Sequence, residues 1–385
     1  MPEYRQYELG SVCSRLSSGK GIPASQVFSE GAFPVYGGNG LRGYTDHSNF
    51  RGDCAIIGRQ GAFCGNVRYF SGEAYMTEHA VVVCANESHN THYLAYLLSQ
   101  MNLGRLSGQS AQPGLSVKTL AKQIIELPPL DVQNKVVAVL SSFDSKIALN
   151  EKINDNLEQQ ALAIFRQYFM DFAPYGGTVP SDWAEVSLDN VCIRITDGSH
   201  YSPTDSPDSP YSMYSVKDME TYGFNSSACK HITEEEFRKM RKGDCVPLLN
   251  DILVAKDGSY LKEIFICSEE KNEAILSSIA IFRPDTSIIM PEILLYLLKQ
   301  PSVRKDVGDN YVSGSALPRI VLKDFKKYRF MLPPMGEQLR IGSALHAIRM
   351  QTKANIDEIR RLSSIRDTLL PKLMSGELDV SAVQL

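Results

Sequence analysis

The apolar residues of the chain form short runs that are typical of buried strands. These runs contain β-branched residues and lie between glycine-rich turns. They are 53–58 (DCAIIG), 79–84 (HAVVVC), 251–256 (DILVAK) and 278–283 (SIAIFR). Leucines recur at helical spacing in 91–101 and again in 291–300, which predicts a helix in each segment. Strands and helices do not alternate regularly, so we expect a mixed α/β fold class rather than a series of βαβ units.

Two longer apolar patterns predict long helices. The proline pair in 127–133 (LPPLDVQ) disfavours helix before it, and apolar residues then follow at spacings of four and three. The pair in 332–338 (LPPMGEQ) is followed by the same pattern. Such spacing, sustained over about four heptads, predicts a coiled-coil seam. Asn150 and Asn355 fall at equivalent seam positions, where a buried amide would set the register of the helices.

The chain contains one set of motifs twice, in the same order. Residues 9–13 (LGSVC) correspond to 188–192 (LDNVC), and 92–100 (HYLAYLLSQ) correspond to 292–300 (EILLYLLKQ). Repetition of this kind predicts two copies of one structural unit. The boundaries that we predict are a first globular domain at 1–127, a first spacer helix region at 128–179, a second globular domain at 180–332 and a second spacer helix region at 333–385.

Two equivalent units in one chain tend to pack about an approximate twofold axis, as identical subunits do. An axis across the long helices would make them antiparallel and would bring Asn150 and Asn355 near their crossing point. The alternative is that each helix packs only on its own domain. A helix from 133 to about 171 would be roughly 58 Å long. An antiparallel pair would therefore hold two pseudo-twofold-related domains on the order of 50 Å apart, which suits a bipartite DNA site.

Composition excludes some functional classes and limits others. The 385 residues include no apolar stretch close to the roughly 18 residues of a membrane span, and the charged N-terminal segment is not a secretory signal. The eight cysteines form no C-x-x-C pair, so we expect reduced thiols in a cytoplasmic protein. The net charge of −4 gives nucleic acid no general support. DNA would have to be bound through local basic patches or with a basic partner protein.

Further segments complete a family resemblance. They are 34–46 (PVYGGNGLRGYTD), 56–67 (IIGRQGAFCGNV) and 196–200 (TDGSH). Together with the duplicated LPP motif and the long helix after each copy, they resemble the specificity subunit of type I restriction–modification systems. The resemblance covers nearly the whole chain, and the order and duplication of the motifs make it specific.

The resemblance implies two target-recognition domains that bind double-stranded DNA at a bipartite, asymmetric site. It also implies that the long helices form an antiparallel coiled coil that spaces these domains and docks two methyltransferase subunits, to which restriction subunits are added. The chain itself would be non-catalytic and would hold no cofactor, because S-adenosylmethionine and ATP would bind only to partner subunits. The alternative function that we weigh is a coiled-coil adaptor whose two domains bind proteins or small ligands.

Loops are the expected place for DNA contacts, because they carry most binding residues in globular domains. The segment 58–61 (GRQG) presents Arg and Gln together, the residue types that make paired hydrogen bonds to guanine and adenine. The candidates in the first domain are Asn39, Arg42, Arg59, Gln60 and Arg68. Those in the second domain are His200, Lys217, Lys256 and Ser259. For Arg59 both a base contact and a phosphate contact remain open.

Two other patterns are weaker guides to function. Gly38, Gly40 and Gly43 match the dinucleotide-binding pattern G-x-G-x-x-G, but turn formers follow them where a helix would have to begin. We therefore expect a glycine turn or a loop near the DNA backbone. The histidines lack the close spacing of metal ligands, so no metal site is expected.

Overall fold

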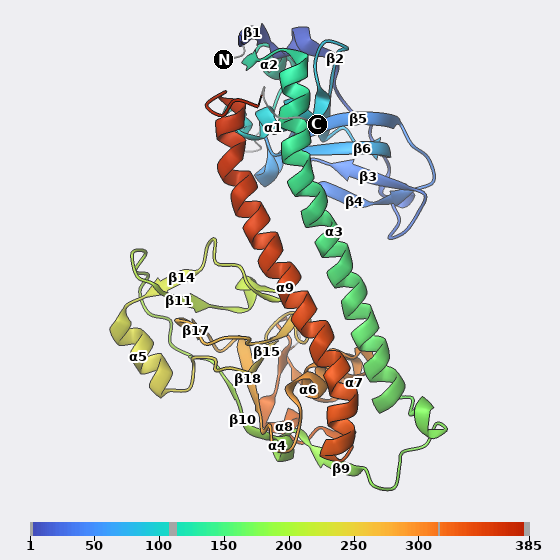
Figure 1. Ribbon diagram of the computed structural model, residues 1–385, viewed down its shortest axis with the longest axis vertical. Helices are drawn as coiled ribbons and strands as arrows, with labels where there is room; N and C mark the ends of the chain where they lie inside the picture. Colours follow the sequence, from blue (N-terminus) through green and yellow to red (C-terminus); the bar gives the residue numbers. More distant parts are fainter. Residues whose placement is uncertain (1–2, 108–113, 315, 381–385) are drawn as a thin grey trace. The chain divides into compact units, whose positions relative to one another are not determined.

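The structure is a computed structural model that describes the chain except residues 1–2, 108–113, 315 and 381–385 (Figure 1). It divides into two compact units, one of residues 1–148 with 359–385 and one of residues 149–358. Each unit contains a globular domain and one half of each long helix, α3 (Leu130–Phe169) and α9 (Met335–Met374). The predicted mixed α/β fold class is confirmed.

The first domain is built on a six-stranded sheet in the order β2-β7-β5-β6-β3-β4. Its strands are β2 (Cys13–Ser18), β3 (Phe33–Gly37), β4 (Gly40–Thr45), β5 (Phe50–Gly58), β6 (Val67–Met76) and β7 (Ala80–Ala85). Helix α1 (Thr91–Ser99) packs on one face, against Ala55 and Ile57. The alternate residues Cys54 and Ile56 pack on the other face, against Phe50. Burial of both faces explains why these strands read as continuous apolar runs.

The second domain repeats the central part of this sheet. Its strands pair in the order β10-β18-β15-β16, which corresponds to β2-β7-β5-β6. They are β10 (Cys192–Asp197), β18 (Ile279–Pro284), β15 (Ile252–Ala255) and β16 (Ile264–Ile266), and α6 (Pro291–Leu298) takes the place of α1. An irregularity of register recurs between Cys13 and Arg15 and between Cys192 and Arg194. The repeat predicted from the motifs is therefore confirmed strand by strand.

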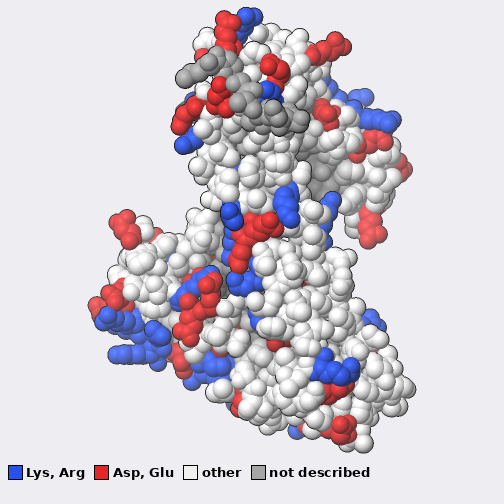
Figure 2. Space-filling model, in the orientation of Figure 1, with Lys and Arg blue, Asp and Glu red and all other residues white. Residues whose placement is uncertain are grey.

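The two domains differ in the layer beside the central sheet. In the first, β3 pairs in parallel with β6 of the main sheet. In the second, β11 (Tyr211–Tyr214) pairs in parallel with β17 (Glu273–Ile275) and antiparallel with β14 (Lys230–Ile232), in a separate sheet beside α5 (Glu234–Lys242). Basic side chains gather around α5 (Figure 2). Many are compensated, because Glu234 pairs with Arg238 at 2.6 Å and Glu235 with Lys239 at 3.0 Å.

A short two-stranded sheet leads into each long helix. Strand β8 (Ile124–Leu127) pairs with β1 (Arg5–Glu8), and β21 (Arg329–Leu332) pairs with β9 (Ala184–Ser187). Strands β8 and β21 each end at the leucine of an LPP motif. The prolines therefore mark the change from strand to helix in both copies.

The glutamine of each LPP motif is a buried link between two helices. Gln133 Oε1 accepts a hydrogen bond from the backbone N–H of Asn90, the residue before α1, and its Nε2 donates to Pro128 O. Gln338 Oε1 accepts from the backbone N–H of Met290, the residue before α6, and its Nε2 donates to Pro333 O. Each glutamine satisfies a backbone group at a helix start that has no partner within the helix. The motif thus fastens the long helix to its domain.

The long helices run antiparallel within each unit. In the first unit, Arg366 of α9 donates to Asp144 of α3 at 2.8 Å, and Leu370 and Leu373 share a buried cluster with Leu140. In the second unit, Asn150 Nδ2 donates to Glu358 and Asn355 Nδ2 to Asn154, both at 2.8 Å. Asn150 and Asn355 are both buried, but neither is the other's hydrogen-bond partner. The amide that faces Asn355 belongs to Asn154, one helical turn further along α3.

The seam of α3 changes near its C-terminal end. Ile147 and Ala161 are buried as the heptad pattern predicts. Beyond Ala161, Phe165 and Phe169 are the buried residues, and the predicted seam residue Tyr168 is only partly buried. Phe169 packs on Trp183 of the second domain, with ring centroids 5.5 Å apart. This end of α3 therefore follows a four-residue spacing, because it packs on a domain as well as on α9.

The buried amide pair gives a first prediction. Replacing only Asn355 by leucine should leave the Asn154 amide buried without its partner and cost about 1–3 kcal/mol of unfolding free energy. Replacing both by leucine should restore most of that loss, because two apolar residues leave no polar group unpaired. Urea unfolding followed by the fluorescence of Trp183, the only tryptophan, measures both variants. Equal losses for the single and double variants would contradict the pairing.

Two general features of the described chain bear on its chemistry. None of the described helices is long and apolar enough to cross a lipid bilayer. All eight cysteines are free thiols. Burial raises the pKa of Cys13 and of Cys54 to about 12, so these thiols are poor nucleophiles.

Candidate nucleic-acid interface

Four segments of the first domain meet at one edge of its sheet. We call them the first strand-end cluster: 18–20, 37–39, 58–60 and 77–79. Gly19 N donates to Ala80 O at 3.0 Å, and Arg59 N donates to His79 O at 3.0 Å. Thr77 N donates to Tyr36 O at 2.9 Å, which joins the turn before β7 to β3. Backbone hydrogen bonds thus hold the ends of β2, β3 and β5 around one short turn.

Glycine is required where these segments come closest. A Cβ atom on Gly19 would lie 2.0 Å from Met76 O, and one on Gly38 would lie 2.9 Å from His79 O. Gly40 has a φ of 98°, a conformation that other residues rarely adopt. Strand β4 begins at Gly40, where a dinucleotide site would need a helix. The segment GNGLRG is therefore a hairpin turn, one of the two expectations from the sequence.

The structure brings the first-domain candidates together around this turn. The Arg42 side chain packs on Gly37, and the Arg68 guanidinium lies beside Gly40. Arg59 Nη1 donates to Ser18 Oγ at 3.4 Å. Asn39 and Gln60 are exposed. Within the part of the chain that the structure describes, none of these arginines forms an ion pair.

The only acidic residue in the turn before β7 has another partner. The Glu78 carboxylate pairs with His79 Nε2 at 3.2 Å. Its second oxygen, Oε2, is buried without a hydrogen-bond partner among the described residues, as is Thr77 Oγ1. The guanidinium groups of Arg42, Arg59 and Arg68 therefore keep their charge available for an anion.

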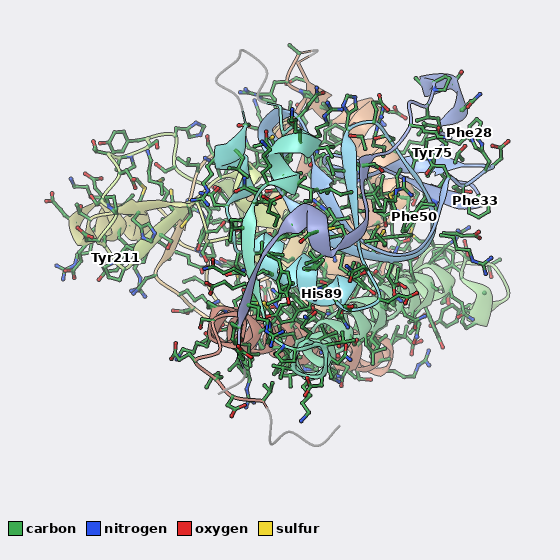
Figure 3. The ribbon with its side chains drawn as sticks, turned by 90° about the horizontal axis from the view of Figure 1, so that it is seen from above. Phe28, Phe33, Phe50, Tyr75, His89 and Tyr211 are labelled. Carbon is green, nitrogen blue, oxygen red and sulfur yellow. The ribbon has the colours of Figure 1, made fainter. Side chains whose placement is uncertain are left out.

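Rings from neighbouring strands support the hairpin that carries Asn39 and Arg42. Figure 3 shows Phe28, Phe33 and Tyr75 in this part of the first domain. Phe28 pairs with Tyr44 of β4 through backbone hydrogen bonds, although half of its surface is exposed. Tyr75 is buried, and its hydroxyl donates to Gly21 O at 2.9 Å. These contacts fix the hairpin to the sheet.

The second domain has an equivalent arrangement, which we call the second strand-end cluster: 197–199, 215–217, 255–257 and 276–278. Gly198 N donates to Ile279 O at 3.1 Å, and Lys256 N donates to Ser278 O at 3.0 Å. Leu276 N donates to Tyr214 O at 2.8 Å. Each of these bonds has a counterpart in the first cluster. In the matching strand registers, Ser18 corresponds to Asp197, Asn39 to Lys217, Arg59 to Lys256 and Gln60 to Asp257.

The candidates of the second domain lie in a different electrostatic environment. Lys256 is only 7% exposed, and its Nζ lies 3.1 Å from Asp197 Oδ2 and 3.2 Å from Asp257 Oδ1. The Asp257 oxygen makes no hydrogen bond of good geometry, so its attraction to Lys256 is purely ionic. His200 is exposed, and its Nε2 lies 3.4 Å from Asp197. That Lys256 contacts DNA stays a prediction, but its two ion pairs give it a structural part as well.

The remaining candidates of the second domain are accessible. Lys217 and Ser259 are both exposed. Lys217 follows β11 just as Asn39 follows β3, and Ser259 lies just after the equivalent of the GRQG loop. Their positions match those of loop residues in the first cluster.

Sequence reasoning missed four residues at these edges. The exposed Lys20 continues the first cluster, since its backbone N–H donates to Met76 O. The exposed Arg319 lies opposite Asp257 in an antiparallel bridge. The carboxylates of Asp197 and Asp257 were missed as partners of Lys256. Alignment of the turn after residue 18 with the one after 197 carried a signal for Asp197, whereas Arg319 becomes adjacent only through the fold.

The chemistry of the clusters is that of binding. No group of three or more His, Cys, Asp or Glu side chains that could hold a metal occurs among the described residues. Arginine groups held on a backbone turn, beside exposed amides, suit contacts with phosphate and with the edges of bases. An exposed loop edge presented by a rigid sheet is a common form of recognition site.

Comparisons with known proteins agree with this architecture. The family model described as "Type I restriction modification DNA specificity domain" matches residues 1–159 and 180–361. A curated relative named type I restriction enzyme EcoprrI specificity subunit, from Escherichia coli, is 36% identical over 147 residues, which are 37% of this chain and 36% of that protein. The MjaIX specificity subunit of Methanocaldococcus jannaschii is 26% identical over 75% of this chain and 69% of its own length.

A solved structure has the same fold. The crystal structure of the S subunit of a type I restriction–modification system from M. genitalium aligns with a TM-score of 0.64 and 15% identity, over 97% of this chain and 96% of that chain. The two family-model matches together cover most of the chain and fall on its two repeats. The chain therefore belongs to the family of type I restriction–modification specificity subunits, the non-catalytic components of these systems.

Proposed function

We propose that this protein reads a bipartite, asymmetric sequence in double-stranded DNA, one half with each domain. The observation that carries the proposal is the recurrence of one strand-end cluster, with the same backbone hydrogen bonds, in both domains. The side chains at the equivalent positions differ, as in Arg59 and Lys256 or Gln60 and Asp257. Equal scaffolds with different side chains suit the recognition of two different half-sites.

The long helices would hold the reading domains in register and dock the partner subunits. Two methyltransferase subunits and the restriction subunits would assemble on this chain, and S-adenosylmethionine and ATP would bind to those subunits. The antiparallel contacts within each unit, through Asp144 with Arg366 and Asn154 with Asn355, support a two-helix spacer. Within this proposal the assembly works in the cytoplasm.

Co-purification tests the proposal against the adaptor alternative. A tagged full-length chain recovered from its host should bring down an adenine methyltransferase that mass spectrometry identifies. The recovered complex should then methylate plasmid DNA at one bipartite sequence. Recovery of other proteins without a methyltransferase, and with no methylating activity, would favour the adaptor.

A further inference from the structure

Residues 59 and 256 occupy one equivalent position in the two domains. The carbonyl of Arg59 accepts a hydrogen bond from Leu115 N at 2.8 Å, and the carbonyl of Lys256 accepts one from Ile320 N at 3.0 Å. In both loops a glycine with positive φ follows two residues later. The backbone thus presents a basic side chain at the same place in both copies.

The neighbours of these side chains have opposite electrostatic character. Lys256 lies between two carboxylates, those of Asp197 and Asp257, and is almost fully buried. One ammonium with two carboxylates leaves a net negative charge at this point of the second domain.

The first domain has neutral residues in place of both carboxylates. Arg59 is half-buried and faces the Ser18 hydroxyl, and Gln60 takes the position of Asp257. Arg42 and Arg68 lie on the glycines of the adjoining turn. In the described chain these guanidinium groups have no carboxylate partner, so this edge carries a net positive charge.

We infer that the first strand-end cluster is a phosphate-binding site for DNA, and that the equivalent site of the second domain is closed by Asp197 and Asp257. The inference rests on the proposed function and adds an asymmetry to it. The first domain supplies more of the salt-dependent affinity at this edge. The second domain presents His200, Lys217 and Arg319 around a neutralised lysine, so its contribution at this position is one of shape and hydrogen bonding.

Salt dependence of DNA binding by the full-length chain measures this asymmetry. Each lost phosphate contact lowers the slope of log K against log salt by about 0.9. With a duplex of about 40 base pairs of arbitrary sequence as the probe, Arg59→Gln should lower the slope by about one. The loss of affinity between about 50 and 200 mM salt should then be about 3.5-fold smaller than for the wild-type chain.

Arg51→Gln is the matched control, because Arg51 is an exposed arginine near the opposite end of the same strand, β5. Its slope should equal that of the wild type. A wild-type slope for Arg59→Gln, or an equal change in both variants, would overturn the inference. Absence of any salt-dependent binding by the wild-type chain would overturn it as well.

Exchange of the equivalent residues gives a second, independent test. Gln60→Asp places a carboxylate beside Arg59 at an exposed position and should lower the slope by about one. Asp257→Gln copies the first domain, while Asp197 still pairs with Lys256 and preserves the fold. It should raise the slope and increase affinity at low salt. No change in either variant would contradict the inferred difference between the clusters.

Failure of the inference is distinguishable from failure of the proposed function. A chain that directs methylation to a bipartite sequence but shows no effect of Arg59→Gln on the salt slope would retain the function and lose the asymmetry. A chain that binds duplex DNA through Arg59 but directs no methylation would have the reverse outcome.

Discussion

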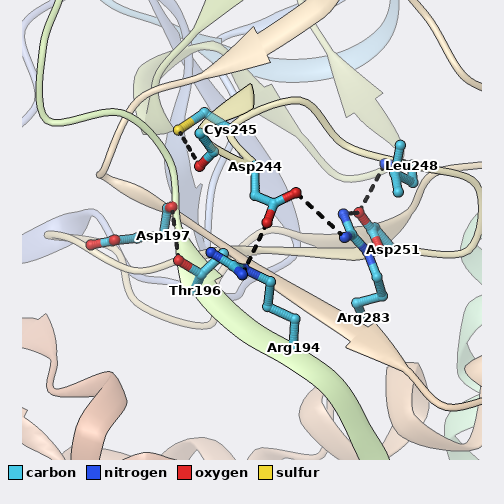
Figure 4. A network of polar contacts seen from close by, with 9 residues as sticks. Arg194, Thr196, Asp197, Asp244, Cys245, Leu248, Asp251 and Arg283 are labelled. Carbon is cyan, nitrogen blue, oxygen red and sulfur yellow. Dashed lines mark hydrogen bonds and ion pairs between the residues drawn. The ribbon is translucent and has the colours of Figure 1, made fainter. Parts of the chain in front are cut away.

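Replacement of Asp251 by alanine is expected to destabilise the second domain by about 3–5 kcal/mol. The Asp251 side chain is fully buried and accepts two hydrogen bonds from Arg283, from Nε and Nη2, each at 2.8 Å (Figure 4). It also accepts one from the backbone N–H of Leu248 at 2.8 Å. These hydrogen bonds raise the pKa of Arg283 further above its ordinary value. Loss of the carboxylate would leave the guanidinium without its partner in the protein interior.

The first domain supplies the design of the control. Its residues at the positions of Asp251 and Arg283 are Cys54 and Cys84, so the same fold tolerates an apolar pair there. The double variant Asp251→Cys, Arg283→Cys should therefore regain most of the lost stability. Urea unfolding followed by Trp183 fluorescence measures both variants. Equal stability of Asp251→Ala and the wild type would contradict the importance of the pair.

An exposed ion pair of similar geometry calibrates this effect. Glu185 pairs with Arg329 at 2.9 Å, and more than half of each side chain is exposed. Glu185→Ala should cost under about 1 kcal/mol, because solvent screens the pair. The contrast with Asp251→Ala would separate the effect of burial from that of charge.

Replacement of Gln338 by alanine is the second large effect that we expect, at about 2–3 kcal/mol. The Gln338 amide is buried and makes three hydrogen bonds to backbone groups, with Met290 N, Ile288 O and Pro333 O. Alanine would leave the N–H before α6 and two carbonyl groups unpaired and away from water. The variant should also weaken the attachment of α9 to the second domain.

Gln159→Ala is a suitable control, because Gln159 is an exposed glutamine within α3. Its change in unfolding free energy should be close to zero, since alanine is a good helix former. The same Trp183 signal follows both variants. A loss for Gln338→Ala no larger than that for Gln159→Ala would show that the LPP glutamine has no fastening function.

The repeat was the most productive feature of the sequence. Two copies of LPP…Q and of the leucine-rich segments at 91–101 and 291–300 predicted two equivalent units, and the strand orders agree. The buried Asn150 and Asn355 were also predicted, because polar residues in a heptad seam stand out against apolar neighbours. The partner of Asn355 was not predictable, since the axial offset of antiparallel helices depends on how the domains pack on them.

Pairwise chemistry inside the domains was beyond sequence reasoning. The ion pairs of Lys256 depend on the strand register, including an irregularity near Arg194 that sets where Asp197 faces the end of β15. The exchange of a cysteine pair for Asp251 and Arg283 is equally invisible without that register. Loop candidates such as Arg59 and Gln60 could be proposed from residue type and position alone, but their charge environment could not.

The most direct measurement of the central claim is methylation-sensitive sequencing of the host genome, with and without this chain. We predict one methylated sequence with two specified halves separated by unspecified bases, absent when the chain is deleted. Substitution of Arg59 in the first strand-end cluster should weaken methylation at this sequence without creating a new second half. Methylation that is unchanged on deletion of the chain would contradict recognition of a bipartite DNA site by this protein.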